Sequence, residues 1–594
     1  MQSLLINTLA DLIVFISMSD LPSHIKRDLI SAIKTLCEKL GRSPEEVPAN
    51  AFELRLLLQT IRPAAHGIKP KTLSNLRSLI AFALKLAGQL DELPRGLAKR
   101  HKDWQGLMNA LFLVDKPTGC ALATFANWCA YKGFKPDDVT DLLLREFCSW
   151  LETRSLHPAP HDLVRQIPIA WERAQNKVEN WPQNQLGRIS FKAPQLRIPW
   201  EALPERFRRE AEAYLSQRKN PDLFDESDKA PTRPLASSTV RQQREHLRIA
   251  ASILMRQHGV NPDRITLSHL VSPNSFKIVL RSLVNQAIEK NRRKLIAQGV
   301  QDPAILDAVP PNAFAICLAA TLIQVGRYYV QVQPEELHAL KKYNSKLKPV
   351  PFDLTEKNKQ LLRQLEVPAT QAKLMFLPEL LQARVAKALQ SGRLHFVDAQ
   401  IALAIDLQLV LPLRPQNLHS LHWQRHFMDL GPDGLRLIIP AAETKSRKRD
   451  IVADIPAEVA QRIDWYRRNV LPKLGGSETG HLFVRQGGAR KDQKTLAGQI
   501  INAIEMHVGV HMTPHQFRHF AAVLYLEKHP NDFETVRNLL GHAFSKTTAI
   551  YAGSSTKRAG IVYANFLFER KDELRICRAG KRRKSTLILA GSGA

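Results

Sequence analysis

Residues 512–526 read MTPHQFRHFAAVLYL, and this stretch predicts a helix start in the carboxy-terminal part of the chain. Thr513 and Pro514 are typical of the N-cap and the first residue of a helix. His515 is then expected in the first helical turn, with Arg518 on the same face. The free N–H groups at this helix start would add to the arginine, so the position suits a phosphate. Taken alone, the same histidine and arginine are equally compatible with ordinary packing.

A second stretch, LLGHAFSKTTAIYAG, occupies residues 539–553. The Asn-Asp pair at 531–532 is expected to cap the preceding helix, and Gly541 is expected to end it in a left-handed conformation. His542 then emerges at a helix end. A short helix after it would present Tyr551, whose hydroxyl can act as a nucleophile, although a surface-packing tyrosine is the simpler interpretation of that residue by itself.

An arginine and a lysine upstream complete the candidate set. Arg414 lies in LVLPLRPQNLHSLHW (409–423), directly after an apolar helix that Pro415 is expected to help end. An arginine at the edge of an apolar core needs an anionic partner, or else it caps the helix carbonyl groups. Lys445 lies in AETKSRKRDI (442–451), at the tip of an expected hairpin, where it can reach a ligand. A solvated charged turn is the alternative there.

Helical periodicity dominates the first 350 residues. Stretches such as IKRDLISAIKTLCEKLG (25–41) and RQQREHLRIAASILMRQHG (241–259) repeat apolar residues with helical spacing. After residue 370 the pattern changes, and helices at 378–390 and 397–411 precede short β-branched runs. These runs predict a small antiparallel sheet with strands at 435–440, 449–456 and 480–484. The expected fold class is mainly α and multi-domain, with a mixed α+β domain toward the carboxyl end.

The charge balance of the chain is strongly basic. It contains 85 Lys plus Arg against 56 Asp plus Glu, a formal net charge of +29. Such an excess requires neutralisation, and the usual partner is a polyphosphate. A generally basic, solvated surface is the alternative. The composition therefore favours nucleic acid as the partner.

Other motifs exclude several classes of protein. The six cysteines form no CxxC pair and no zinc-finger spacing, so they are expected to be reduced. The sequence contains no P-loop lysine motif and no acidic cluster suited to Mg²⁺. The apolar stretch Leu4–Met18 carries Asp11 and is too short to cross a bilayer, so a core helix is expected. We therefore expect no cofactor, no metal site, no membrane association and a cytoplasmic location.

The order of these motifs over roughly residues 370–570 resembles the catalytic domain of the tyrosine recombinases, the phage integrase family. LRPQNLHSLHW resembles the first arginine box of the family, TPHQFRHFAA the second, and LLGHAFSKTTAIYAG the histidine–tyrosine box. Asn417 departs from the pattern, because the family usually has an acidic residue there. The resemblance implies a catalytic site of Arg414, Lys445, His515, Arg518, His542 and Tyr551.

The resemblance also implies a division into domains. Family members commonly carry a helical core-binding domain before the catalytic domain, and the first 200 residues exceed that plan. The expected domains are an amino-terminal helical region (1–90), a helical DNA- or partner-binding domain (91–200), a core-binding domain (236–348), the catalytic domain (365–570) and a basic tail (571–594).

The reaction that the resemblance implies is cleavage and rejoining of double-stranded DNA through a 3′-phosphotyrosyl intermediate, without metal or ATP. The two arginines would hold the non-bridging phosphate oxygens, and His542 would hydrogen-bond the phosphate. His515 would assist the attack of Tyr551 as a general base, and Lys445 would protonate the departing 5′ oxygen. The expected assembly is a homo-oligomer, a dimer on one site and a tetramer in synapsis.

Three activities remain open at this point. The first is a site-specific recombinase, integrase or transposase. The second is a type IB topoisomerase, which shares the tyrosine chemistry but relaxes DNA as a monomer. The third is a catalytically inactive DNA-binding relative. The Leu-Gly-His box favours the first activity, and the presence of all six expected residues argues against the third.

Overall fold

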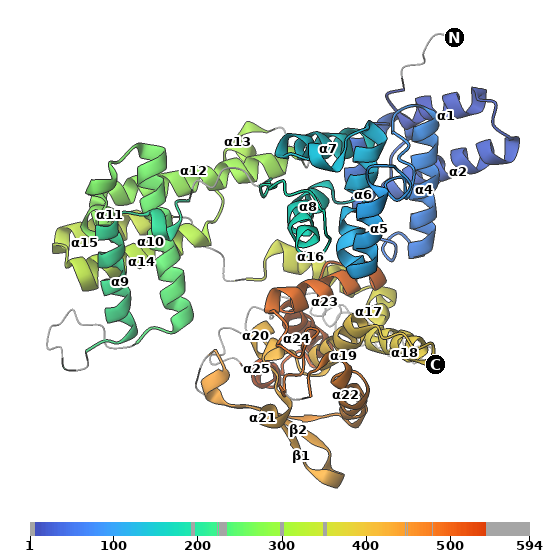
Figure 1. The fold of residues 1–594 in the computed structure, drawn as a ribbon. Helices are drawn as coiled ribbons and strands as arrows, with labels where there is room; N and C mark the ends of the chain where they lie inside the picture. Colours follow the sequence, from blue (N-terminus) through green and yellow to red (C-terminus); the bar gives the residue numbers. More distant parts are fainter. Residues whose placement is uncertain are drawn as a thin grey trace, which may run out of the picture. The chain divides into compact units, whose positions relative to one another are not determined.

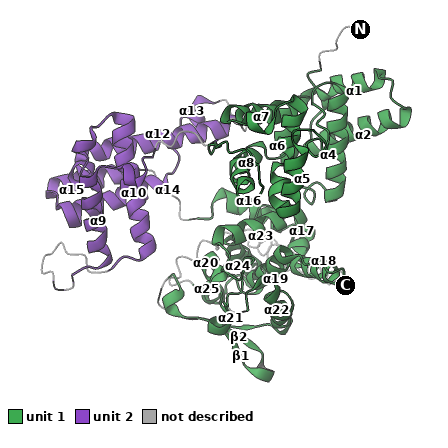
Figure 2. Cartoon of the chain, viewed as in Figure 1, with its two compact units in different colours: residues 1–189, 353–594 green, residues 190–352 purple. Residues whose placement is uncertain are grey.

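The computed structural model describes residues 6–191, 197–222, 224, 234–297, 302–347, 353–445, 447, 449–477 and 479–541. The chain divides into two compact units (Figure 1; Figure 2). Unit 1 comprises Met1–Ile189 and Asp353–Ala594, and unit 2 comprises Ser190–Phe352. Unit 2 is therefore inserted in the sequence between two parts of unit 1.

Amphipathic helices form the beginning of unit 1. They are α1 (Leu9–Met18), α2 (Ser23–Leu40), α3 (Ala51–Thr60) and α4 (Pro70–Leu86). Their apolar faces share one hydrophobic cluster, in which Leu12, Ile33, Leu54 and Ile80 are fully buried. α1 belongs to this cluster and begins after Thr8, which caps it through a reciprocal bond with Asp11. The apolar stretch near the amino terminus therefore includes the core helix that the sequence predicts.

The next part of unit 1 is built around aromatic side chains. Its helices are α5 (Gln105–Val114), α6 (Lys116–Lys132), α7 (Asp141–Arg154) and α8 (Pro160–Gln175). Trp128 and Phe147 pack with ring centroids 5.2 Å apart, and Trp171 packs edge-on against Trp181 at 5.1 Å. Buried aromatic pairs of this kind add to the area that each ring removes from water.

The regular secondary structure of unit 2 is helical in its described residues. Its helices are α9 (Glu205–Lys219), α10 (Ser237–His258), α11 (Leu267–Val271), α12 (Pro273–Ala297), α13 (Pro303–Leu306), α14 (Ala313–Val325), the π-helix Gly326–Val330 and α15 (Pro334–Ser345). The stretch Ala313–Val330 is long and apolar enough to cross a membrane by length and composition alone, a test that core helices also pass. Leu318, Leu322 and Val325 of this stretch are fully buried in the hydrophobic core of the unit.

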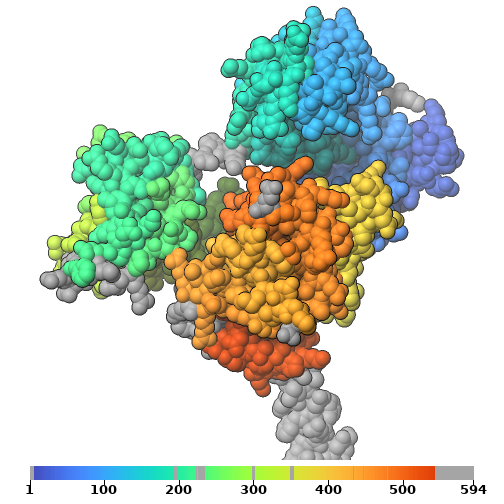
Figure 3. Space-filling model, turned by 60° about the horizontal axis from the view of Figure 1, so that its bottom comes forward, coloured from blue at the N-terminus to red at the C-terminus, as the bar shows by residue number. Residues whose placement is uncertain are grey.

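The carboxy-terminal part of unit 1 surrounds one apolar helix. Its helices are α16 (Glu356–Leu365), α17 (Pro368–Met375), α18 (Leu377–Gln390), α19 (Phe396–Val410), α20 (Pro415–His419), α21 (Trp423–His426), α22 (Ala457–Asn469), α23 (Gln493–His507), α24 (Gln516–Lys528) and α25 (Phe533–Leu540). All residues of α19 from 399 to 408 are buried, because α18, α22, α23 and α24 pack around it. In Figure 3 the surface of this part runs from yellow through orange to red.

A three-stranded antiparallel sheet lies beside these helices, in the order β1 (Phe427–Asp429), β2 (Leu435–Ile439) and β3 (Ile451–Ile455). Leu437 on the central strand lies opposite Phe427 on one side and Ala453 on the other. The mainly helical fold with a small antiparallel sheet is confirmed. One predicted strand is wrong: residues 480–484 form only isolated bridges at His481 and Val484, and 427–429 supply the third strand.

Candidate active site

Arg518 is buried at the start of α24, with only 5% of its surface exposed. Its Nη1 donates a 2.8 Å hydrogen bond to the carbonyl oxygen of Pro412, and its Nη2 donates to the carbonyl oxygen of Leu540. The guanidinium of Arg518 therefore bonds both the segment that follows α19 and the carboxyl end of α25. Its orientation is set by the protein before any ligand binds.

Arg414 reaches the same helix end from another direction. It is the N-cap residue of α20, and its Nη2 lies 3.5 Å from the carbonyl oxygen of Gly541. Burial lowers the pKa of this guanidinium from its usual value. Arg414 and Arg518 thus approach consecutive carbonyl groups, those of Leu540 and Gly541. The alternative interpretation of Arg414 is capping of the carbonyl groups of the preceding apolar helix, but the carbonyl group that it approaches belongs to Gly541, at the end of α25.

The local sequence explains this arrangement, with two differences from the prediction. Asp532 caps α25 by accepting from the N–H of Thr535, and Gly541 ends it with φ +56°, both as predicted. α19, however, ends at Val410, so Pro415 begins α20 and does not end the apolar helix. The residues between them form the short segment from which Arg414 projects.

The start of α24 also differs from the prediction. The helix begins at Gln516, and His515 is its N-cap residue, one position before the first turn. A side chain that the sequence reasoning did not use bonds back to the predicted cap: Oε1 of Gln516 accepts from both the N–H (2.8 Å) and the hydroxyl (3.0 Å) of Thr513. These bonds fix the turn that precedes α24, which contains Pro514 and His515.

His515 and Lys445 share the electrostatic field of the two arginines. The pKa of His515 is lowered, chiefly by partial desolvation of the ring and then by the charges of Arg518, Arg414 and Lys445. Lys445 itself is exposed, in the segment between β2 and β3. The structure therefore brings four of the six predicted residues together. The other two, His542 and Tyr551, lie outside the described residues.

His519 is a neighbour that the sequence reasoning missed. Its ring lies edge-on to that of His515, with centroids 5.5 Å apart. Burial, followed by the neighbouring His515 and Arg518, lowers its pKa to about 4. The available signal was its spacing of one helical turn from His515.

Glu443, two residues before Lys445, was also missed. Its carboxylate pairs with Arg425 and lies 3.1 Å from Nε2 of His426. Its carbonyl oxygen accepts a 3.2 Å hydrogen bond from Nδ2 of Asn417. No sequence signal links these residues, because they meet only when the hairpin folds back onto α20 and α21.

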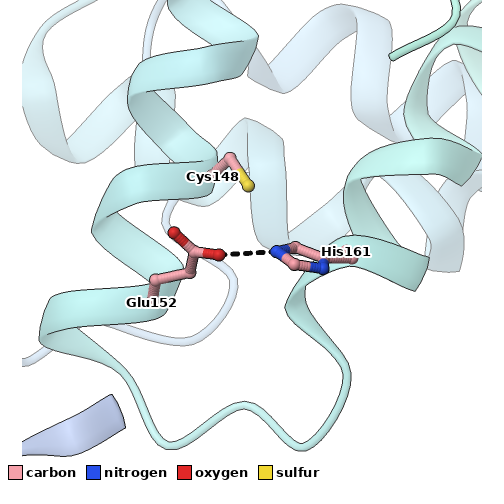
Figure 4. Close-up of side chains that lie close together, drawn as sticks. All are labelled: Cys148, Glu152 and His161. Atoms are coloured by element: carbon pink, nitrogen blue, oxygen red, sulfur yellow. Dashed lines mark hydrogen bonds and ion pairs between the residues drawn. The ribbon is translucent and has the colours of Figure 1, made fainter. Parts of the chain in front are cut away.

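A separate cluster joins α7 to α8, away from these residues in the sequence. Within the described part of the chain it is the one group of three potential metal ligands: Cys148, Glu152 and His161 (Figure 4). Nε2 of His161 lies only 2.5 Å from Oε1 of Glu152. Two such ligands of a tetrahedral zinc ion lie roughly 3.3 Å apart. Burial raises the pKa of Cys148 to about 11, so the cluster is a Glu152–His161 hydrogen bond beside a protonated thiol.

Comparison with known proteins places the candidate site within a family segment. Residues 381–558 match the model of the phage integrase family. The tyrosine recombinase XerC of Chromohalobacter salexigens is 34% identical over 120 residues, which cover 20% of this chain and 38% of the relative. XerC of Pseudomonas putida strain W619 is 32% identical over 99 residues, 17% of this chain and 32% of the relative. The match thus spans about a third of the length of these relatives.

Solved structures give weaker likenesses. A lambda integrase dimer bound to a core site covers 58% of this chain and 94% of its own, with 13% identity and a TM-score of 0.31. XerH recombinase bound to its difH substrate covers 62% and 99%, with 16% identity and a TM-score of 0.27. These scores are too low to place any element of the site. The family match itself confirms, for residues 381–558, the predicted resemblance to the tyrosine recombinases of the phage integrase family.

Proposed function

We propose that this protein cleaves and rejoins double-stranded DNA as a site-specific recombinase, integrase or transposase, with Tyr551 as its nucleophile. The observation that carries the proposal is the convergence of Arg414 and Arg518 on the last carbonyl groups of α25, directly before His542. Two permanently charged guanidinium groups at one point are suited to the non-bridging oxygens of a phosphodiester. The family match over 381–558 supports the same activity.

In the proposed reaction, the phenol oxygen of Tyr551 attacks the phosphorus and the bond to the 5′ oxygen breaks. The products are a 3′-phosphotyrosyl link and a free 5′ hydroxyl, whose proton comes from Lys445. Arg414 and Arg518 stabilise the additional negative charge of the pentacoordinate transition state. Attack of a 5′ hydroxyl on the phosphotyrosine reverses the sequence. No ATP is consumed, because the phosphoester bond is exchanged and not hydrolysed.

His515 is proposed as the group that accepts the phenol proton. An imidazole can do so only in its neutral form, and the lowered pKa of His515 keeps it neutral near pH 7. The surrounding cations that lower this pKa also favour the phenolate of Tyr551. His542 is proposed to hydrogen-bond a phosphate oxygen.

The test is covalent trapping on a nicked suicide substrate, from which the cleaved end diffuses away. The wild-type protein is expected to form a protein–DNA adduct without metal or ATP, and Tyr551→Phe is expected to form none. Tyr525→Phe is a matched control, since Tyr525 donates its hydroxyl proton to Asp532 (2.7 Å) at the start of α25, the opposite end from the carbonyl groups that the arginines bond, and has no proposed role. An adduct that persists in Tyr551→Phe would remove the nucleophile assignment.

The partner and assembly form part of the same proposal. Double-stranded DNA is the proposed substrate, bound in the cytoplasm by a dimer on each site that pairs into a tetramer. Recombination that requires two sites, together with loss of activity on dilution to monomer, is the expected result. Relaxation of supercoiled DNA by the monomer would instead identify a type IB topoisomerase.

A further inference from the structure

We propose that Glu443 is a positioning residue that sets where Lys445 sits relative to Arg414. The proposal rests on the proposed function, in which Lys445 protonates the departing 5′ oxygen. A flexible lysine on an exposed hairpin meets this requirement only if its backbone is fixed with respect to the phosphate-binding arginines.

The side chain of Glu443 is anchored to α21. Arg425 and His426, both on that helix, pair with the two carboxylate oxygens. His426 is 2% exposed, and its Nδ1 accepts the N–H of His422 at 3.0 Å. Because Nδ1 is an acceptor, Nε2 carries the proton and donates it to Glu443. The ring is thus fixed in one tautomer that holds the carboxylate.

The backbone of Glu443 is anchored to α20. Asn417, 3% exposed, donates from Nδ2 to the Glu443 carbonyl oxygen at 3.2 Å. α20 begins directly after Arg414, so the same short helix carries a phosphate-binding arginine at its start and the hairpin anchor on its third residue. Glu443 therefore links the proton donor to the phosphate clamp through both its side chain and its backbone.

This geometry accounts for the one departure from the family pattern. A carboxylate at 417 has no proton to donate and would face the Glu443 carbonyl oxygen as a second acceptor. The amide of Asn417 supplies the donor that the contact requires. In this chain the carboxylate near the first arginine box is contributed by Glu443 from the hairpin.

The turn after Glu443 is held in the same way. Thr444 is 4% exposed, and its hydroxyl donates to the carbonyl oxygen of Ala441 at 2.9 Å. The N–H of Arg447 donates to the Thr444 carbonyl oxygen at 3.2 Å, and the N–H of Ala441 donates to Asp450 at 2.7 Å. Lys445 is exposed directly after these bonded residues, and its charge contributes to the lowered pKa of His515.

The test uses DNA in which sulfur replaces the bridging 5′ oxygen at the cleavage site. A thiolate leaves without a proton, so this substrate no longer needs the proton donor. Lys445→Ala and Glu443→Gln are both expected to slow cleavage of ordinary DNA, Glu443→Gln by between about tenfold and a hundredfold. With the sulfur substrate, both variants are expected to cleave at about the wild-type rate. Arg414→Ala is expected to stay slow on both, because phosphate binding is still needed.

Two further variants keep the test independent of folding. Asn417→Asp is isosteric but cannot donate, and Arg425→Gln alters a side chain that is 60% exposed. Both are expected to follow Glu443→Gln. Asp454→Asn is the matched control, because it breaks a surface pair with Arg436 on the same sheet, away from the turn, and is expected to cleave both substrates normally.

The outcomes separate the two proposals. Without an adduct from the wild-type protein, the proposed function fails. Failure of the sulfur substrate to restore Lys445→Ala removes the lysine as proton donor. If Lys445→Ala recovers while Glu443→Gln does not, or if Glu443→Gln cleaves ordinary DNA at the normal rate, the positioning role of Glu443 is wrong.

Discussion

At the scale of single residues, Arg518 shows how the site is preorganised. A guanidinium that is 5% exposed and bonded to the carbonyl groups of Pro412 and Leu540 has little freedom left to lose when a ligand arrives. Charges that are fixed before the reaction cost no reorganisation during it. The same bonds make Arg518 a structural residue, because its loss would leave two buried carbonyl groups without their donor.

His519 leads to a prediction about pH and stability. Its folded pKa of about 4 lies below the ordinary value of 6.5. Between these values the unfolded chain binds a proton that the folded chain does not, so stability falls as pH drops from about 6.5 to about 4 and is unaffected above that window. His519→Gln removes this pH-dependent contribution to the free energy of unfolding. The decrease in Tm between pH 7 and pH 5 is expected to be smaller in the variant than in the wild type.

The control is His24→Gln, which replaces an exposed histidine on α2 and is expected to keep the full decrease. Differential scanning calorimetry in matched buffers measures both. Equal pH slopes for His519→Gln and the wild type would show that this histidine is not held neutral by burial.

At the scale of elements, the end of α25 is the part of the site that is most sensitive to backbone change. Gly541 adopts φ +56°, and a side chain placed there would have no atom within 4 Å. The cost of Gly541→Ala is therefore conformational, about 1 kcal/mol. Because Arg414 and Arg518 bond the last carbonyl groups of α25, the variant is expected to lose cleavage activity as well as stability.

Gly498→Ala provides the comparison for this prediction. Gly498 lies inside α23, also with no atom within 4 Å of an added side chain, so alanine there is expected to stabilise the helix by about 0.8 kcal/mol. Urea unfolding and the rate of adduct formation measure the two effects. If Gly541→Ala cleaves DNA at the wild-type rate, the conformation at the end of α25 does not affect the site.

The elements also show where sequence reasoning succeeds. Long helices such as α2 and α10 are predictable because apolar periodicity repeats over many turns, whereas α19 is recognised by a mostly apolar run that is too long for a typical strand. The strand β1 has three residues, too few for an alternating pattern to show. The false strand at 480–484 is apolar for another reason: Leu482, Phe483 and Val484 are buried in the helical core without forming a ladder. An apolar run in the sequence therefore predicts that a segment is buried, but it does not show whether the segment pairs as a strand.

At the scale of the whole molecule, net charge gives a prediction about DNA affinity. The +29 charge is expected to act through phosphate contacts that release counterions. Log K is then expected to fall linearly with log salt, by about 0.9 for each phosphate neutralised, and affinity is expected to drop about a thousandfold or more between 50 and 200 mM salt. Fluorescence anisotropy measures this slope. A DNA affinity that does not change with salt concentration would contradict the prediction that the positive charge of the chain binds DNA.

The division of the chain into units illustrates a limit of sequence patterns at this scale. Unit 2 is continuous in sequence, and the residues of its hydrophobic core all lie within it. The hydrophobic cluster around α19 likewise draws on residues from 361 to 520. Composition indicates helical, multi-domain structure, but which helices share a core depends on packing between faces that look alike in sequence.

The sequence by itself determined the chemical groups of the candidate site and their local geometry. The spacing of His515 from Arg518, the glycine end of α25 and the hairpin that carries Lys445 all follow from interactions within a few residues. Only the tertiary structure decided that Arg414 and Arg518 meet at the carbonyl groups of Leu540 and Gly541, and that Asn417 holds the Glu443 backbone. Helical periodicity and capping are local, whereas these contacts join distant segments packed around the buried helix α19.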